Sequence, residues 1–374
     1  MANDREAMTG EGRMGASTAS SSSGPQPSAL RPQPSSSSRI LFAEVEEWEI
    51  ERILNAFGDD ARLIPEPLSE KNASAARDAR ILSTFIYSMI DKPVLDAMPD
   101  LRMIATRSTG FEHIDLDECA RRGIVVSYVP RYGDVTVAEH TFALILALAK
   151  HIVESADRTR RGEFDFRGLR GFELAGKTIA IVGAGKIGLN VARIARGFCM
   201  AIIAFDKYPN QQAAAELGMA YLPYDDLLRQ ADVVTYHVPE SPETHHMLNE
   251  NNIGLLKPNC LVINTARGSV IETRALVRAI SEGKVRGAGL DVLEEEPVVR
   301  EERELVSSLF QQKHNLQAIL SGQILLRLNN VLITPHNAFN TDEAVLRILD
   351  TTISNIQSFV AGQPINLVPA PVHV

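Results

Sequence analysis

Short apolar runs alternate with stretches of helical apolar spacing along most of the chain. Four runs of strand length lie in the first part, at residues 40–43, 80–83, 103–106 and 124–127. Helical spacing, with apolar residues every three or four positions, follows the first run to about residue 57 and occupies residues 116–122 before the last run. This alternation is typical of a small α/β domain built on a parallel sheet.

The segment from Val137 to about Thr159 departs from this alternation. It reads as one long helix that is apolar nearly all round in its first half, so we expect it to be buried between domains or subunits. Glu139 and His140 lie near its start and could be catalytic in principle. Polar contacts at a helix start are the favoured interpretation of both residues.

The stretch from Thr178 to Asp206 carries the strongest local signal. A strand-like apolar run leads into Gly183, Gly185 and Gly188, a helical period follows, and a second apolar run ends at the aspartate. The glycines permit a tight turn, close approach of backbone to a pyrophosphate, and helix–strand packing, while helix amides face the phosphates. The carboxylate suits ribose hydroxyls and would repel the extra phosphate of NADP. The stretch therefore predicts NAD binding.

The rhythm of strands and helices repeats after this motif. Further strands are expected at residues 232–236, 261–264, 287–290 and 331–334. The repeat predicts a doubly wound, Rossmann-type parallel sheet, in which ligands bind outside the carboxyl ends of the strands. A helix over about 342–360 can then return the chain to the first domain.

These patterns divide the chain into three parts. Residues 1–38 are rich in Ser and Pro and are expected to form a disordered tail. Residues 39–136 and 337–374 are expected to form a smaller, flavodoxin-like α/β substrate domain. Residues 137–336 are expected to form the NAD-binding domain, with the long interdomain helix at 137–160.

Composition narrows the range of partners. A formal net charge of −9 and scattered basic residues argue against nucleic acid. The longest apolar run, residues 142–149, is too short to span a membrane. Cys119, Cys199 and Cys260 form neither a metal-ligand spacing nor a disulfide framework, so a reducing, cytoplasmic location is expected.

Three polar residues at expected strand ends are candidates for catalysis. Arg267 could hold a carboxylate through two parallel hydrogen bonds, although most arginines form surface ion pairs. Glu296 lies in an acidic run whose other members, Glu294 and Glu295, we interpret as solvated. His336 follows a proline, where a structural role is common. Together the three suit reduction of a 2-oxo acid, with the arginine orienting the substrate, the protonated histidine donating to the carbonyl oxygen and the carboxylate stabilising the imidazolium.

Two further histidines, His245 and His246, lie in a polar loop. No acid or cysteine accompanies them at metal-ligand spacing. We therefore interpret both as surface residues and expect no metal site in the protein.

Several motifs in this order resemble a known family. GAGKIG with its following aspartate, HVPESPETHHMLN, NTARGSVIET, GAGLDVLEEEP and ITPHNAFNT resemble the D-isomer-specific 2-hydroxyacid dehydrogenases. Within that family, VPRYGDVTVAEHTFALILAL most resembles the fermentative D-lactate dehydrogenases. The resemblance covers roughly residues 40–368, and the motifs are specific in combination.

The resemblance implies a role for each matching residue. Arg267 would anchor the substrate, Glu296 would be the partner carboxylate, His336 the proton donor, and the long helix part of a dimerisation arm. The implied cofactor contacts are Gly183, Gly185, Lys186, Ile187, Gly188, Asp206, Val238, Pro239, Thr244, Thr265, Ala266, Arg267 and Asp291. The implied substrate contacts are Ser108, Thr109, Gly110, Tyr132, Arg267 and Phe339.

The expected activity is NAD-dependent interconversion of pyruvate and D-lactate by a homodimer. Other 2-oxo acids, such as hydroxypyruvate or a branched or phosphorylated acid, remain alternatives, and Arg131 beside Tyr132 is compatible with a bulkier or more anionic substrate. A different class, an NADH-sensing corepressor, also remains open.

Overall fold

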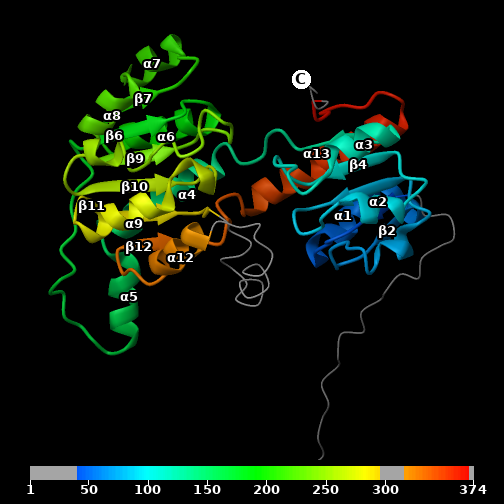
Figure 1. Ribbon diagram of the computed structural model, residues 1–374, viewed down its shortest axis with the longest axis horizontal. Coiled ribbons are helices and arrows are strands. Elements are labelled where there is room, and N and C mark those ends of the chain that lie inside the picture. The colour runs from blue at the N-terminus through cyan, green and yellow to red at the C-terminus, as the bar shows by residue number, and fades with distance from the viewer. Residues whose placement is uncertain (1–39, 295–315, 370–374) are drawn as a thin grey trace, which may run out of the picture.

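The computed structural model describes residues 40–294 and 316–369, which form two lobes side by side, each built on one parallel sheet (Figure 1). The expected tail over 1–38 lies outside the described residues. So do Glu295, Glu296 and residues 370–374. The predictions made for these residues therefore stay predictions.

The first lobe contains a five-stranded sheet in the order β2-β1-β3-β4-β5, with every pair parallel. This order is the flavodoxin-like one that we predicted. Its strands are β1 (Ile40–Phe42), β2 (Ala61–Leu63), β3 (Ile81–Thr84), β4 (Met103–Thr106) and β5 (Val125–Ser127). Its helices are α1 (Glu47–Phe57), α2 (Lys92–Asp96), α3 (Leu116–Arg122) and α13 (Asp342–Val360).

Helix α13 returns the chain to the first lobe, as Figure 1 shows in red. Thr341 caps its start by accepting a hydrogen bond from the Ala344 amide. Leu349, Ile353 and Ile356 then pack in one core with residues of β1, β3 and β4. The helix is therefore an integral layer of the lobe, although more than 200 residues separate it from most of its neighbours.

The second lobe contains a seven-stranded parallel sheet in the order β12-β11-β10-β9-β6-β7-β8. Its strands are β6 (Thr178–Val182), β7 (Ala201–Phe205), β8 (Met219–Tyr221), β9 (Val233–Tyr236), β10 (Cys260–Asn264), β11 (Val285–Leu290) and β12 (Val331–Ile333). Its helices are α4 (Thr136–Ala149), α5 (Ile152–Arg160), α6 (Lys186–Gly197), α7 (Gln211–Leu217), α8 (Tyr224–Gln230), α9 (Thr273–Ser281) and α12 (Leu316–Leu325).

This second sheet has the doubly wound order that we predicted. From β6 the chain first runs outward through β7 and β8, then crosses to β9 on the other side and continues to β12. The reversal between β6 and β9 is the switch point at which open α/β sheets bind ligands. The central strands are buried along most of their length, as is typical of parallel strands covered by helices on both faces.

The prediction of one long helix over residues 137–160 is wrong. The structure divides this segment into α4 and α5, which meet at an angle of 62°. His151 adopts a left-handed backbone with φ of 52°, which cannot continue an α-helix. The carbonyl of Ala149, the last residue of α4, accepts from the Phe172 amide at 3.0 Å. The segment around Phe172 therefore binds a carbonyl that would accept a helical hydrogen bond if α4 continued.

Within residues 40–294 and 316–369, no single helix is long and apolar enough to cross a membrane. Only α4 and α5 taken together pass such a test, and the 62° bend separates them. Eight of the fourteen residues of α4 are buried, and the helix packs against α6 and the second sheet. Its apolar character is therefore explained by packing inside the protein.

Candidate active site

The glycine turn joins β6 to α6 at the switch point. Gly183 has a φ of 93°, and a Cβ on it would come within 2.8 Å of the His237 backbone. A Cβ on Gly188 would overlap the Gly183 carbonyl. Gly185, the residue before α6, instead faces open space. The turn thus leaves room for a pyrophosphate over Gly185, beside amides at the positive end of the helix dipole.

Asp206 lies at the end of β7, next to this turn. Its Oδ2 accepts from the Ala184 amide and its Oδ1 from the Tyr208 amide, both at 2.7 Å. Each oxygen keeps capacity to accept a further hydrogen bond, as from a ribose hydroxyl. The residues at this end of the sheet therefore fit a dinucleotide in the way the sequence predicted.

The other predicted cofactor residues lie at the same edge of the sheet. Lys186 and Ile187 form the first turn of α6, Val238 and Pro239 follow β9, and Thr265 and Ala266 follow β10. Thr244 donates to the Pro239 carbonyl at 2.7 Å, which closes the loop after β9. Their individual contacts with a cofactor stay predictions.

Asp291, predicted as a cofactor contact, also holds the loop that carries His336. Its side chain is buried, and its oxygens accept from the amides of Asn337 at 3.0 Å and Ala338 at 2.9 Å. The Thr334 hydroxyl donates to the same carboxylate at 2.5 Å. Residues on both sides of His336 are thereby fixed, and His336 itself has a left-handed backbone with φ of 53°. Such strain is concentrated at functional sites.

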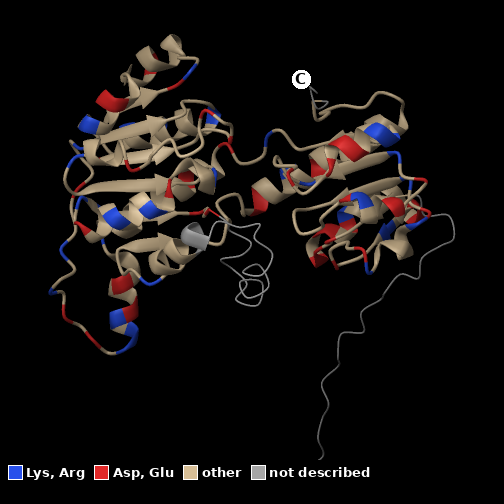
Figure 2. Cartoon of the chain, in the orientation of Figure 1, with Lys and Arg blue, Asp and Glu red and all other residues tan. Residues whose placement is uncertain are grey.

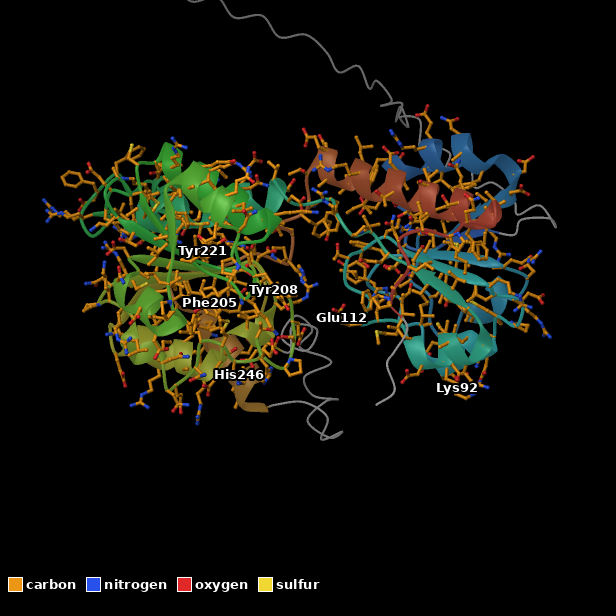
Figure 3. All side chains as sticks on the ribbon, turned by 90° about the horizontal axis from the view of Figure 1, so that it is seen from above. Lys92, Glu112, Phe205, Tyr208, Tyr221 and His246 are labelled. Atoms are coloured by element: carbon orange, nitrogen blue, oxygen red, sulfur yellow. The ribbon has the colours of Figure 1, made fainter. Side chains whose placement is uncertain are left out.

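Arg267 follows β10 and faces the first lobe. Its Nη2 lies 3.4 Å from the position that a Cβ on Gly110 would take, and the Glu112 carboxylate lies 2.5 Å from that position. Glu112 projects from the first lobe toward the second in Figure 3. The anchor predicted on one lobe and the backbone cradle predicted on the other are thus neighbours.

The predicted cradle is ordered by its own side chains. The Ser108 hydroxyl donates to the Gly110 carbonyl, and the Thr109 hydroxyl donates to the Val129 carbonyl, both at 2.6 Å. These bonds fix the backbone that follows β4. Main-chain amides held in this way can receive a substrate carboxylate without further ordering.

Aromatic side chains bound the site on one side. The rings of Tyr132 and Phe339 meet edge to face at 5.9 Å, and Phe85 lies at the same centroid distance from Phe339. Burial raises the pKa of the Tyr132 phenol, while the positive charge of Arg267 acts in the opposite direction. The phenol therefore stays neutral at physiological pH.

A pocket of about 180 Å³ brings most of these residues together. Its lining includes Thr109, Tyr132, Ile187, Thr265, Ala266, Arg267, Asp291, His336 and Phe339. The third predicted catalytic residue, Glu296, lies outside the described residues. The pocket thus unites an anchor for an anion, an ionisable imidazole and the predicted cofactor surface.

The interpretation of Glu294 as solvated is wrong, and His246, interpreted as a surface residue, is partly exposed and pairs with it. Glu294 accepts from His246 Nε2 at 2.6 Å and from the Thr273 amide at 2.7 Å, and its side chain is only 10% exposed. The pair joins the loop after β9 to the start of α9. The partners are separated by 48 residues, so local sequence spacing could not reveal the pair.

Two further histidines lie close to the candidate site. His140 Nε2 lies 3.0 Å from the Thr334 hydroxyl and 3.6 Å from Asp291 Oδ1. His140 therefore makes a polar contact near a helix start, in agreement with the favoured interpretation. His237, at the glycine turn, is only partly exposed, and burial lowers the pKa of its imidazole to about 3, so the imidazole is neutral.

Comparison with known proteins agrees with this geometry. The family model for the D-isomer specific 2-hydroxyacid dehydrogenase, NAD binding domain, matches residues 142–338. The glyoxylate reductase of Pyrococcus furiosus is 37% identical over 327 residues, which cover 86% of this chain and 87% of the relative. The D-lactate dehydrogenase of Escherichia coli is 34% identical over 319 residues, covering 84% and 93%.

A solved structure shows the same fold with its ligands bound. The D-lactate dehydrogenase of Aquifex aeolicus, in complex with NAD and lactic acid, is 36% identical, with a TM-score of 0.73 and coverage of 86% of this chain and 96% of that one. The resemblance that we identified from the motifs is confirmed. The chain therefore belongs to the D-isomer specific 2-hydroxyacid dehydrogenases and is an NAD-dependent oxidoreductase of D-2-hydroxy acids.

Proposed function

We propose that this enzyme interconverts pyruvate and D-lactate, with His336 as the acid/base. The observation that carries the proposal is the small pocket of about 180 Å³ that Arg267 and His336 share with the Tyr132–Phe339 ring pair. A pocket of this size suits a compact acid better than a long one. The relative from Escherichia coli and the solved structure from Aquifex aeolicus, both D-lactate dehydrogenases, support the choice.

Substrate orientation is assigned to Arg267 and the cradle. The guanidinium binds the substrate carboxylate through two parallel hydrogen bonds, and amides of residues 108–110 bind it from the first lobe. Because the two groups belong to different lobes, the substrate is held where the lobes meet. Its reacting carbonyl then points toward His336.

Proton transfer is assigned to His336. NADH, when bound, would supply the hydride that the carbonyl carbon accepts, and the protonated imidazole of His336 gives its proton to the carbonyl oxygen. Asp291 keeps the imidazole in place through the amides of Asn337 and Ala338. Glu296 is assigned the role of stabilising the protonated imidazole, on the strength of its position in the LDVLEEEP motif.

Glyoxylate reduction is the second candidate. Glyoxylate has no side-chain carbon, and the Pyrococcus furiosus relative is named a glyoxylate reductase. A more anionic acid is less favoured, because the Arg131 guanidinium, although Arg131 lines the same pocket, is already paired with Asp134 at 3.0 Å. A bulkier acid is less favoured because the pocket is small. The corepressor alternative is not retained, since the chain is an oxidoreductase by family.

A panel of 2-oxo acids tests the choice of substrate. NADH oxidation is measured with pyruvate, glyoxylate, hydroxypyruvate and a branched 2-oxo acid at matched concentrations. We expect the highest kcat/KM with pyruvate and D-lactate as its product. A kcat/KM for glyoxylate about tenfold above that for pyruvate would replace the proposal by the second candidate.

We also propose that the enzyme is a homodimer that uses the region of α5 as an arm. Ile152 and Val153 are more than half exposed, and Phe164 and Phe166 are each 84% exposed. Between them, charged residues of both signs lie close together on α5 (Figure 2), including the Glu154–Arg158 pair. Exposed aromatic residues in this number are costly in a monomer. Light scattering of wild type and a Phe164→Ser/Phe166→Ser variant tests the proposal, which predicts a monomer for the variant.

The remaining assignments are proposals of the same kind. We assign residues 39–136 and 337–374 to substrate binding and 137–336 to NAD binding, since the two sheets separate there. We assign the enzyme to the cytoplasm, because all three cysteines are free thiols and Cys199 is exposed. An exposed thiol is stable only in a reducing compartment.

A further inference from the structure

Glu44 follows β1 and carries a carboxylate that is buried below the candidate site. Its Oε1 accepts from the Thr84 hydroxyl at 2.8 Å and from the amides of Phe85 at 3.2 Å and Ser88 at 3.1 Å. The Ser88 hydroxyl also donates to Oε1, and the Tyr87 amide donates to Oε2 at 2.9 Å. Five donors from residues 84–88 thus converge on one side chain, which determines the course of the loop after β3.

The loop over residues 84–88 forms one wall of the site, which we call the Phe85 wall. Phe85 packs edge to face on Phe339, which packs in turn on Tyr132. A cavity of about 570 Å³ is lined by Glu44, Phe85, Phe339 and His336 together with residues around them. This cavity adjoins the smaller pocket through His336 and Phe339, which line both. A substrate side chain that extends past Tyr132 would therefore meet Phe85.

The backbone of Glu44 is held in a strained conformation. Glu44 has a φ of 58°, a left-handed conformation that residues with a Cβ adopt rarely. His336 is strained in the same way and lines the same cavity. Strain of this kind persists only where the surrounding contacts fix it, as the five donors to the Glu44 carboxylate do here.

Arg107 links Glu44 to the carboxylate cradle. Its Nη2 donates to the carbonyls of Ala43 at 2.8 Å and Glu44 at 2.7 Å, and its Nε lies 3.3 Å from the Glu49 carboxylate. Arg107 directly precedes Ser108, the first cradle residue, and is only 3% exposed. Glu44 therefore connects two parts of the site. Its carboxylate binds the Phe85 wall, and its carbonyl binds Arg107, which leads into the cradle.

We propose that Glu44 is a positioning residue that fixes the Phe85 wall and thereby sets the length of the 2-oxo acid side chain that the site accepts. The proposal rests on the proposed function for its kinetic test. It extends that function, because none of the motifs that define the family assigns a role to Glu44.

The test compares Glu44→Gln with Glu118→Gln. Gln keeps the shape of Glu44 but places an amide group against the Tyr87 amide, so two donors face each other. Glu118, in α3 of the same lobe, is also a largely buried carboxylate, and it pairs with Arg121 and Arg122 and not with the loop after β3. It serves as a control for loss of stability without a change in the wall. Ser88→Ala, which removes one of the five donors to Glu44 and also the acceptor of the Leu68 amide, gives a graded second variant.

The kinetic readout is the ratio of kcat/KM for 2-oxohexanoate to that for pyruvate. We expect Glu44→Gln to raise the ratio about fivefold and the KM for pyruvate about tenfold, with NADH affinity unchanged. Ser88→Ala should change the ratio in the same direction by a smaller factor. An unchanged ratio in Glu44→Gln, or an equal change in Glu118→Gln, overturns the proposal.

A second readout does not depend on turnover. Hydrogen exchange of the Phe85, Tyr87 and Ser88 amides should become faster in Glu44→Gln and stay as in wild type in Glu118→Gln. Equal exchange in wild type and Glu44→Gln overturns the role of Glu44, whatever the substrate is. A wild type that reduces no 2-oxo acid overturns the proposed function alone, and the two failures are thereby distinguished.

Discussion

The two lobes contribute different kinds of groups to the candidate site. The second lobe supplies side chains with chemistry of their own, Arg267 and His336, each directly after a strand. The first lobe supplies backbone amides and a ring, from residues 108–110 and Phe85, which are held by buried polar side chains beneath them. Reaction is thus assigned to one lobe and positioning mostly to the other.

This difference implies a ranking of mutational effects. Removing a group that binds or reacts with the substrate should cost most, because its energy is expressed in the transition state. Removing a group that positions such a residue should lower the activity less, since the residue can still adopt its active conformation part of the time. Substitutions at the ribose carboxylate and at the break between α4 and α5, which lie further from the reacting atoms, should have the smallest effects.

Among conservative substitutions, Arg267→Lys should have the largest effect. An ammonium keeps the charge but cannot form two parallel hydrogen bonds to a carboxylate, so kcat/KM for pyruvate should fall about 100-fold. The measurement is steady-state pyruvate reduction at saturating NADH. Arg274→Lys, at the exposed pair with Glu250, is the control and should be neutral. Near-normal kinetics in Arg267→Lys would remove this residue from the site.

Asp291→Asn should have the next largest effect. An Asn side chain cannot accept from both the Asn337 and Ala338 amides with the oxygens in their present places, so the His336 loop loses one anchor. We expect a loss of about tenfold in kcat and about 2 kcal/mol in stability.

A matched control separates activity from stability in this case. Asp232 accepts from the Thr178 amide at 2.8 Å at the opposite, amino-terminal end of the second sheet. Asp232→Asn should lower the unfolding free energy and leave kcat unchanged. If both variants lost activity in proportion to stability, Asp291 would have no special part in positioning His336.

Asp206→Ala should change cofactor preference more than rate. Loss of the carboxylate removes an acceptor for the ribose and the repulsion of a 2′-phosphate, so the NADH/NADPH ratio of kcat/KM should fall on the order of tenfold. Titration of both cofactors against wild type provides the measurement. An unchanged ratio would contradict the assignment of Asp206 to the ribose.

The smallest predicted effect concerns the break between α4 and α5. In a left-handed conformation Gly is favoured over Ala, so His151→Gly should be about 1 kcal/mol more stable than His151→Ala. In a continuous helix the order would be reversed, by about the same amount. Urea unfolding of the two variants therefore reports the geometry of the break by the sign of the difference.

Much of the fold was predictable because its signals are local. Helix α13 has the bounds that the apolar period indicated, and the six strands predicted for the second sheet agree within two residues, whereas the edge strand β8 was not predicted. The same holds for Arg267 and His336, since residues that follow strands of a parallel sheet gather at one edge. The residue types in TARG and TPH were visible in the sequence.

The missed features depend on contacts between distant segments. Phe172 determines the end of α4, His246 determines the environment of Glu294, and the loop over 84–88 determines that of Glu44. None of these partners lies at a helical or strand spacing from the residue that it fixes. The rule that ligand sites lie after parallel strands, applied to the first sheet as to the second, would have drawn attention to residues 44, 85 and 107.

Proton transfer is assigned to His336 and cofactor binding to other residues, and one variant tests this division most directly. His336→Ala is measured for pyruvate reduction and, by fluorescence titration, for NADH binding. We predict a fall in kcat of about 1,000-fold, because the proton donor is removed altogether, with an NADH dissociation constant within about twofold of wild type. A variant that turns over at the wild-type rate would contradict the role of His336 in catalysis.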